Sequence, residues 1–262
     1  MLTDYKKDDL ILRRENDEEE GELQKAYNWR KKSIFFELPY WEFNLIRHNL
    51  DVMHIEKNVS DNVLFTLLGT PGKSKDNLNS RKDLELLKIR QALHPQQRGS
   101  GKMYLPPACF TMDKKEKYTF YQVLKGIKVL DGYSSNISRC VHLKDRTVSG
   151  LKSHDSHILM QQLLPLTIRT ILPKNVVEAL IELSNFFRQL CSKVNTVRDL
   201  ENVQDRVAIT LCCLEKIFPP SFFDVMEHLP IHLAEEALIA GPVQFRSMYP
   251  IERYKFKQYK VS

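Results

Sequence analysis

The chain has little glycine, proline and cysteine: its 262 residues include nine glycines, twelve prolines and five cysteines. So few glycines and prolines argue against a low-complexity protein. The cysteines have no C-x-x-C spacing, which gives little support for a structural zinc site, and their odd number favours reduced thiols. Cys212 and Cys213 lie in an apolar helical pattern, so we expect both to be small core residues.

Long apolar runs are missing as well. No run approaches the roughly 18 residues of a membrane-spanning helix, and residues 1–9 lack the apolar centre of a signal peptide. We therefore expect an intracellular protein with no membrane partner. Residues 99–102 are not a phosphate-binding loop, because the first glycine and the preceding apolar strand are absent. No nucleophile elbow stands out either, so we expect no small-molecule substrate.

Charge is distributed unevenly along the chain. Residues 1–30 contain nine acids and six bases, a net charge of −3, and because the whole chain carries +6 the remainder carries +9. The acidic cluster at 15–22 predicts a polar, disordered extension over residues 1–32. The basic remainder is compatible with a polyanionic partner such as DNA, although many helical proteins without such a partner have a similar excess.

Amphipathic helices are the pattern of most of the chain after the extension. Residues 33–38 form a short apolar segment that can be extended, and the loop-rich stretch at 126–152 can contain a hairpin. We expect a mainly α structure, an irregular multi-helix domain with little or no sheet of its own. Three regions are predicted: 1–32, 33–152 and 153–262. The predicted helices are 39–68, 80–93, 112–125, 154–171 with a bend at Pro165, 173–194, 197–218, 221–240 and 251–259.

A polar stripe is embedded in the first of these helices. Asp51, His54, Asn58 and Asp61 are three, four and three residues apart, and residues at these offsets share one helix face. Such a stripe is costly to bury unless its groups are paired or used in function. The spacing alone favours a helix cap followed by a solvated face.

Two pairs of histidines have spacings that metal sites use. His154 and His157 are three apart at a predicted helix start, where Ser153 and Asp155 can instead cap the helix. His228 and His232 are four apart, as in zinc-binding helices. Pro230 lies between them, which favours a packing or surface role.

The polar stripe lies within a sequence segment that resembles a known protein family. The segment Glu37-Leu-Pro-Tyr-Trp41, followed by Arg47-His-Asn-Leu-Asp51-Val-Met-His54-Ile-Glu-Lys-Asn58, closely resembles plant DNA transposases of the CACTA (En/Spm) class. Further short segments that resemble this family follow along the chain in the same order as in the family. They are Leu105-Pro-Pro-Ala-Cys109, Asp131-Gly-Tyr-Ser-Ser-Asn-Ile-Ser-Arg-Cys140, Gly150-Leu-Lys-Ser-His-Asp155-Ser-His157, Leu214-Glu-Lys-Ile-Phe-Pro-Pro220, Phe222-Phe-Asp-Val-Met226, Gly241-Pro-Val-Gln-Phe-Arg246 and Met248-Tyr-Pro-Ile-Glu-Arg-Tyr254.

The resemblance implies that the chain corresponds to the C-terminal half of such a transposase, including the start of a domain of unknown function that follows the transposase core. In this family a ribonuclease-H-like core is thought to hold two Mg²⁺ ions with three carboxylates. Asp51 and His54 match the family's Asp-x-x-His motif, and Glu252 is a candidate third acid, so these three are the candidate catalytic residues. The family's strand-borne acids lie mainly upstream of the matched part.

Three functions follow from this resemblance. The first, which we favour, is a transposon-derived fragment without strand-transfer activity, a helical flank of the core that needs no cofactor of its own. The second is a domesticated DNA- or protein-binding helical module. The third is part of a metal-dependent transposase or nuclease, for which Mg²⁺ is implied. The expected partners are transposon-end DNA or other transposase subunits, and the expected location is the nucleus.

The resemblance also makes a structural prediction about the polar stripe. If Asp51 and His54 are remnants of the family's core, their side chains should pair inside the protein, because unpaired polar groups are costly to bury. The expected partners are residues of the loop region 126–157.

Overall fold

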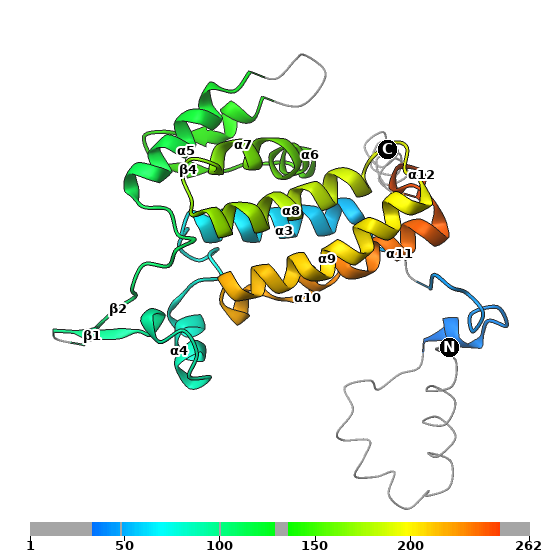
Figure 1. Cartoon of the computed structure of the whole chain (residues 1–262), viewed down its shortest axis with the longest axis horizontal. Helices are drawn as coiled ribbons and strands as arrows, with labels where there is room; N and C mark the ends of the chain where they lie inside the picture. Colours follow the sequence, from blue (N-terminus) through cyan, green and yellow to red (C-terminus); the bar gives the residue numbers. More distant parts are fainter. Residues whose placement is uncertain (1–32, 48, 100, 129–135, 247–262) are drawn as a thin grey trace, which may run out of the picture. The chain divides into compact units, whose positions relative to one another are not determined.

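The computed structural model describes residues 33–47, 49–99, 101–128 and 136–246 (Figure 1). The described residues divide into two compact units, with the division after residue 47; the boundary between 152 and 153 stays a prediction. The predicted extension at 1–32 and the predicted helix at 251–259 lie outside the described residues.

The first unit contains a short 3₁₀ helix where an extended segment was expected. This helix, η1 (Ile34–Glu37), begins at Ser33, whose side chain accepts a hydrogen bond from the backbone N–H of Phe35 at 3.4 Å. The Phe35 ring stacks on Trp41 with 5.1 Å between the ring centroids. The predicted helix start at residue 39 is wrong, because residues 39–47 form turns and irregular backbone.

The second unit is a mainly α fold in which α3 (Val52–Leu67) packs against helices from the C-terminal half (Figure 1). Helix α3 contacts α6 (Ser153–Ile158) and α10 (Val225–His228). A long pair, α8 (Lys174–Leu190) and α9 (Val197–Ile217), packs side by side, and α11 (Pro230–Ala240) lies against α9. The fold class is therefore as predicted from the amphipathic patterns.

The predicted bend at Pro165 corresponds to a change of helix type. Helix α6 continues into η4, a π-helical turn (Leu159–Leu163), and then into α7 (Leu164–Ile168). Proline has no N–H to donate to the preceding turn, and a wider π turn is one way in which a helix accommodates such a break. The predicted single helix at 221–240 is also divided, since α10 and α11 are separated at Leu229.

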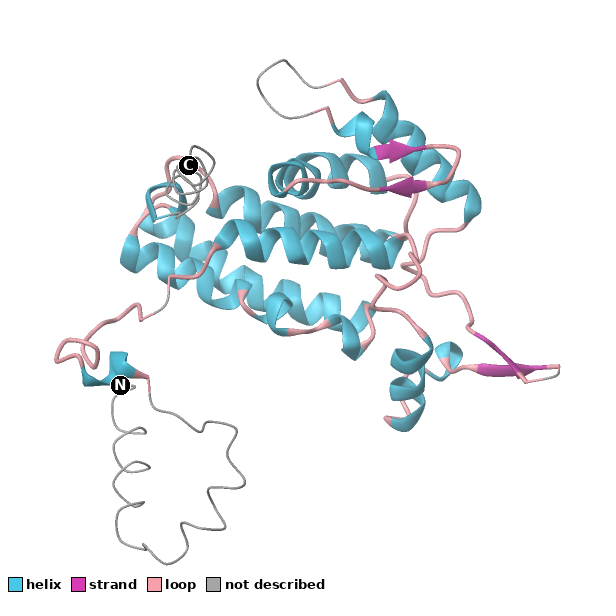
Figure 2. Cartoon of the chain, turned by 180° about the vertical axis from the view of Figure 1, so that it is seen from behind, coloured by secondary structure: helices cyan, strands magenta, loops and turns pink. Residues whose placement is uncertain are grey.

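In the part of the chain that the structure describes, the β structure consists of two small antiparallel hairpins (Figure 2). The hairpin of β3 (Val141–His142) and β4 (Thr147–Val148) lies in the loop-rich stretch where a hairpin was predicted. A second hairpin, β1 (Gln96–Arg98) with β2 (Lys102–Tyr104), lies between two predicted helices, where no strand was predicted. Strands of three residues are too short to produce a clear alternation of apolar and polar side chains.

Capping side chains set where the shorter helices begin. Asn77 and Ser80 form a capping box that starts α4 (Leu78–Leu86), and Asp113 with Glu116 starts α5 (Lys114–Gly126). Both starts lie within two residues of the predicted ones. The remaining short elements are η2 (Gln91–Leu93), η3 (Ile137–Cys140), η5 (Pro220–Phe222) and α12 (Val243–Arg246).

The buried face of α9 excludes the two adjacent cysteines that were expected in the core. Cys212 and Cys213 are both exposed, because the buried stripe of this helix passes through other positions: Leu200, Val203, Val207, Thr210, Leu214 and Ile217. Among the described residues, no helix is both long enough and apolar enough to span a membrane.

Candidate functional site

Asp51 and His54 lie at the start of α3 and are exposed. Asp51 is the N-cap of the helix, and its side chain accepts a hydrogen bond from the backbone N–H of His54 at 3.1 Å. The predicted pairing of these side chains inside the protein is therefore wrong. Glu252, the third candidate acid, lies outside the described residues.

The rest of the polar stripe also finds its partners within α3. The side-chain amide of Asn58 donates to the backbone carbonyl of His54 at 2.9 Å, and Lys57 Nζ lies 2.8 Å from the Asp61 carboxylate. The stripe is thus a capped and locally bonded helix face, which is the interpretation that the spacing alone favoured.

A buried polar cluster lies elsewhere on α3, at Glu56. This carboxylate is fully buried, and it joins two residues that follow one another along α6 and η4. Its Oε2 atom lies 2.6 Å from Nδ1 of His157, and its Oε1 atom accepts a hydrogen bond from the Gln161 side-chain amide at 2.9 Å. Gln161 Nε2 is also 3.2 Å from His157 Nδ1. Three groups from two segments about a hundred residues apart in sequence therefore meet in one cluster.

Cys191, the C-cap residue of α8, completes this cluster. Its sulfur, a carboxylate oxygen of Glu56 and a ring nitrogen of His157 all lie within 4.8 Å of one another. Burial raises the pKa of the Cys191 thiol, and the nearby Glu56 carboxylate raises it further. Burial also raises the pKa of Glu56, against the opposing effect of its hydrogen bond with His157. Burial thus disfavours the charged form of both acids, because charge is costly away from water.

The sequence indicated only one member of this cluster. His157 was noted beside His154 as a possible metal ligand, with helix capping as the preferred alternative. The capping prediction is confirmed for Asp155, whose Oδ2 accepts the backbone N–H of Lys152 at 2.9 Å. Glu56 could have been found from its position, since it is an acid on the apolar side of a helix pattern.

The second histidine pair is at the surface. His228 and His232 are exposed, and their Nε2 atoms are 3.3 Å apart. This placement agrees with the packing or surface role that the intervening proline favoured.

A second polar junction ties α3 to the start of α10. The side-chain amide of Asn62 donates to Glu227 Oε1 at 2.6 Å, and Lys75 Nζ lies 2.7 Å from Asp224 Oδ2. Asp224 is also the N-cap of α10, because its Oδ1 accepts the backbone N–H of Met226 at 2.8 Å.

The two acids of this junction have pKa values shifted in opposite directions. Burial and a hydrogen bond with Asp224 raise the pKa of Glu227 to about 8. Burial acts against ionisation of Asp224 too, but hydrogen bonds from Glu227, Lys75 and the Met226 N–H lower its pKa to about 2. One proton therefore stays on Glu227 near neutral pH while Asp224 carries the charge.

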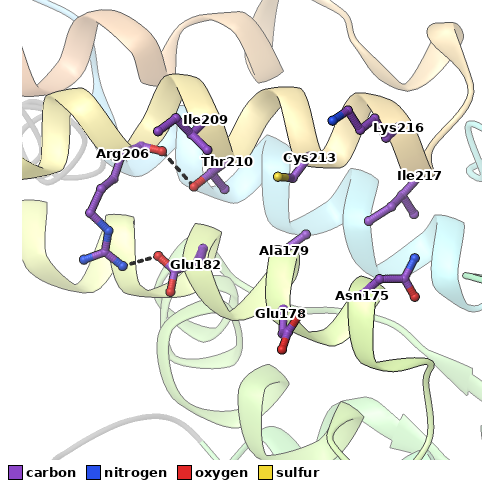
Figure 3. Close-up of a pocket in the computed structure, with 10 residues that line it drawn as sticks. All are labelled: Asn175, Glu178, Ala179, Glu182, Arg206, Ile209, Thr210, Cys213, Lys216 and Ile217. Carbon is purple, nitrogen blue, oxygen red and sulfur yellow. Dashed lines mark hydrogen bonds and ion pairs between the residues drawn. The ribbon is translucent and has the colours of Figure 1, made fainter.

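A groove of about 480 Å³ runs between α8 and α9 (Figure 3). Ala179, Ile209 and Ile217 give it an apolar lining, and the exposed Cys213 side chain lies within it. An ion pair between Glu182 and Arg206 crosses one end. The groove is a surface feature separate from the two polar clusters, since it shares no residue with either.

Comparison with known families gives a match in the C-terminal part of the chain. Residues 190–261 match the family described as Domain of unknown function (DUF4218). The matched region begins at the end of α8 and takes in α9, α10, α11 and α12. The predicted domain of unknown function at this end of the chain is confirmed. No curated protein and no solved structure matches the chain.

Proposed function

We propose that this chain is a transposon-derived protein related to part of a CACTA transposase, and that it does not carry out strand transfer on its own. The proposal rests on two findings. Short segments that resemble the family occur in the family's order along the chain, and residues 190–261 match a domain of unknown function. Such a protein would act in the nucleus, with transposon-end DNA or other transposase subunits as its partners.

The observation that carries the proposal is the junction between the two halves of the resemblance. The helix that contains the Asp-x-x-His motif bonds directly to the matched region through Asn62 and Glu227 at 2.6 Å. Next to that helix, the backbone N–H of Leu50 donates to Glu236 at 3.1 Å, and Lys75 pairs with Asp224. Family-like segments that lie far apart in sequence therefore belong to one helical unit, as expected for a continuous piece of one ancestral protein.

The surroundings of Asp51 support the absence of strand transfer from the isolated chain. Two-metal phosphoryl transfer needs several carboxylates that converge on the same ions. Asp51 is instead used as a helix cap, and the crevice beside it is shared with the cationic Arg246. Arg246 lies 2.8 Å from Glu236 and 3.0 Å from the Asn49 side-chain oxygen, so the nearest acid in this network is already paired.

A cleavage assay tests the proposal. The full chain is incubated with duplexes carrying CACTA-type ends in Mg²⁺ or Mn²⁺, and products of cleavage and joining are resolved on denaturing gels. We expect no product above the level of a protein-free control. Metal-dependent nicking that disappears in both Asp51→Ala and Glu252→Ala would overturn the proposal and support a transposase or nuclease.

DNA binding is a second candidate function, favoured by where the positive charge lies. Residues 78–152 contain 15 bases and six acids, a net charge of +9, so the other residues together carry −3. Within this segment Lys114, Lys115, Lys144 and Arg146 are exposed. Exposed lysine and arginine side chains attract the phosphate backbone of DNA and make binding depend on salt.

Matched charge reversals test this second function. Lys114 and Lys115 lie in the first turn of α5, where an acid is favourable for the helix, so Lys114→Glu with Lys115→Glu should leave the fold intact. The control reverses Lys174 and Arg198, which are exposed in the first turns of α8 and α9. We measure duplex binding by fluorescence anisotropy over a series of salt concentrations.

The basic-segment variant should bind more weakly than the wild-type chain, and its log–log salt slope should fall by about one for each phosphate that the variant no longer binds. The control variant should keep the wild-type affinity and slope. Equal weakening in the two variants would show only a response to net charge, and a wild-type chain without salt-dependent binding would exclude the function.

A further inference from the structure

Glu56, His157 and Cys191 bring three different metal-binding atoms together from α3, α6 and the end of α8. We propose that these residues form a binding site for one zinc ion. The site is separate from the Asp-x-x-His motif, and it does not depend on whether the chain acts on DNA.

The ligand chemistry selects zinc among the common divalent ions. Zinc binds thiolate, imidazole and carboxylate together, whereas magnesium and calcium prefer oxygen ligands alone. A thiolate from Cys191 and the Glu56 carboxylate supply two negative charges, which balance the charge of one Zn²⁺ ion. A neutral assembly of this kind is compatible with the complete burial of Glu56, because an isolated charge there would be costly.

The present distances are close to those of a coordinated ion. Ligand atoms in a tetrahedral zinc site lie roughly 3.4–3.6 Å apart, given Zn–N and Zn–O bonds of about 2.0–2.1 Å and Zn–S bonds of about 2.3 Å. The three atoms here lie within 4.8 Å of one another, and the Glu56 and His157 atoms are in direct contact at 2.6 Å. Coordination would therefore need movements of about 1 Å, in which the Glu56 and His157 atoms separate to admit the ion and the Cys191 sulfur moves toward it. His157 is partly exposed, with 20% of its side chain accessible, which gives an ion a route into the site.

Gln161 lies beside the three proposed ligands. A tetrahedral site has a fourth ligand, which would be the Gln161 side-chain amide or a water molecule. It is held in η4, the π-helical turn, and π turns inside α-helices are frequent at functional sites. Its side chain already contacts Glu56 at 2.9 Å and His157 at 3.2 Å. A side-chain amide can present either oxygen or nitrogen to a neighbour by rotation.

Zinc binding would release the proton of the Cys191 thiol to solvent, since cysteine binds the metal as its thiolate. The ion would also connect the end of α8 to α3 and α6, so it should stabilise the fold as a structural site does.

Cobalt is the probe, because Co²⁺ replaces Zn²⁺ in such sites and a bound thiolate gives it a sulfur-to-metal charge-transfer absorption. The reduced full chain, stripped of metal with a chelator and then freed of it, is titrated with Co²⁺. We expect this absorption to saturate at one equivalent and to disappear when Zn²⁺ is added. Zn²⁺ should also raise the melting temperature of the wild-type chain.

Matched cysteine variants decide whether the thiolate comes from this site. Cys191→Ser should abolish the absorption and weaken zinc binding at least about tenfold, the lower end of what even outer-shell changes cost. Cys213→Ser, at an exposed cysteine, should retain both. Circular dichroism checks that each variant is folded, and Glu56→Gln provides a second disruption with all five thiols present.

Several results would overturn the proposal. A wild-type chain that binds Co²⁺ without the thiolate absorption would place the ion elsewhere, for example at His228 and His232. An absorption that persists in Cys191→Ser, or no binding at all, would mean that Glu56 and His157 form only a buried hydrogen-bonded pair.

Discussion

The two sides of α3 use polar residues in opposite ways. On one side the stripe of Asp51, His54, Asn58 and Asp61 finds its partners within the same helix, and Asp51 and His54 are exposed. On the other side Glu56, roughly 200° around the helix from Asn58, is fully buried and bonds to residues 101 and 105 positions away in sequence.

This difference separates a sequence motif from a structural constraint. The stripe is conspicuous because its residues are polar and regularly spaced, yet its bonds are local and solvent can replace them. Glu56 has no regular spacing to mark it, but it is buried and bonded to a distant segment, so the loss of its partners is costly. Mutations on the two sides of α3 should therefore differ in cost by several-fold.

The largest effect is expected at Glu56. Glu56→Ala removes a fully buried side chain and leaves the polar atoms of His157 and Gln161 without their partner. We expect the free energy of unfolding to fall by roughly 2–5 kcal/mol, as for other buried truncations and broken buried pairs. Urea denaturation with a chelator present measures this, and Glu56→Gln, which keeps the side-chain shape, should cost less. A decrease of less than about 0.5 kcal/mol, which is typical of surface positions, would contradict the expected difference between the two sides of α3.

The next effect concerns pH and Glu227, the buried acid that α3 contacts through Asn62. Its pKa is about 8 in the folded chain against 4.5 for the free side chain, so between these pH values the unfolded chain loses a proton that the folded chain keeps. Stability should therefore fall as pH rises from about 4.5 to about 8, at most by about 1.4 kcal/mol per pH unit. Asp224 acts in the opposite direction only below about pH 4, where its pKa of about 2 matters.

Glu227→Gln tests this slope because glutamine cannot ionise. The variant should show a shallower decline in melting temperature between pH 5 and 8 and should be more stable than the wild-type chain at pH 8. Glu235→Gln, at an exposed position of α11, is the control and should keep the wild-type slope. A wild-type chain with flat stability over this range would mean that Glu227 is ionised in the fold.

Local signals in the sequence were sufficient for most of the helices. Helix α9 begins at Val197 and α8 begins next to Pro173, as the patterns predicted, because capping and apolar periodicity act over a few residues. The sequence could not show that Glu56 meets His157 and Cys191, since their proximity depends on how α3, α6 and α8 pack. The interior pairing predicted for Asp51 and His54 was wrong for the same reason: the resemblance identified the motif, but whether its helix face is buried depends on how the helices pack.

A smaller effect is expected at Asp51. Asp51→Ala removes the side-chain acceptor that caps α3, and the loss of such a cap costs about 1 kcal/mol. Asp51→Asn should retain most of the stability, because asparagine is a comparable N-cap. Chemical denaturation of the two variants side by side distinguishes capping from a role of the charge itself. A destabilisation in Asp51→Asn as large as in Asp51→Ala would favour a role for the carboxylate beyond capping.

The smallest effect is expected at His54, although it belongs to the family motif. Its hydrogen bonds to Asp51 and Asn58 use its backbone N–H and carbonyl, at 3.1 and 2.9 Å, and both survive when the side chain is truncated. His54→Ala should therefore change the free energy of unfolding by less than about 0.5 kcal/mol, the usual range for a surface substitution. Thermal melting beside Glu56→Ala gives the sharpest form of the comparison, because the two residues are only two positions apart on the same helix. If His54→Ala were as destabilising as Glu56→Ala, the motif face would have to be buried against a second copy of the chain, and repeating the melt at low protein concentration would reveal it.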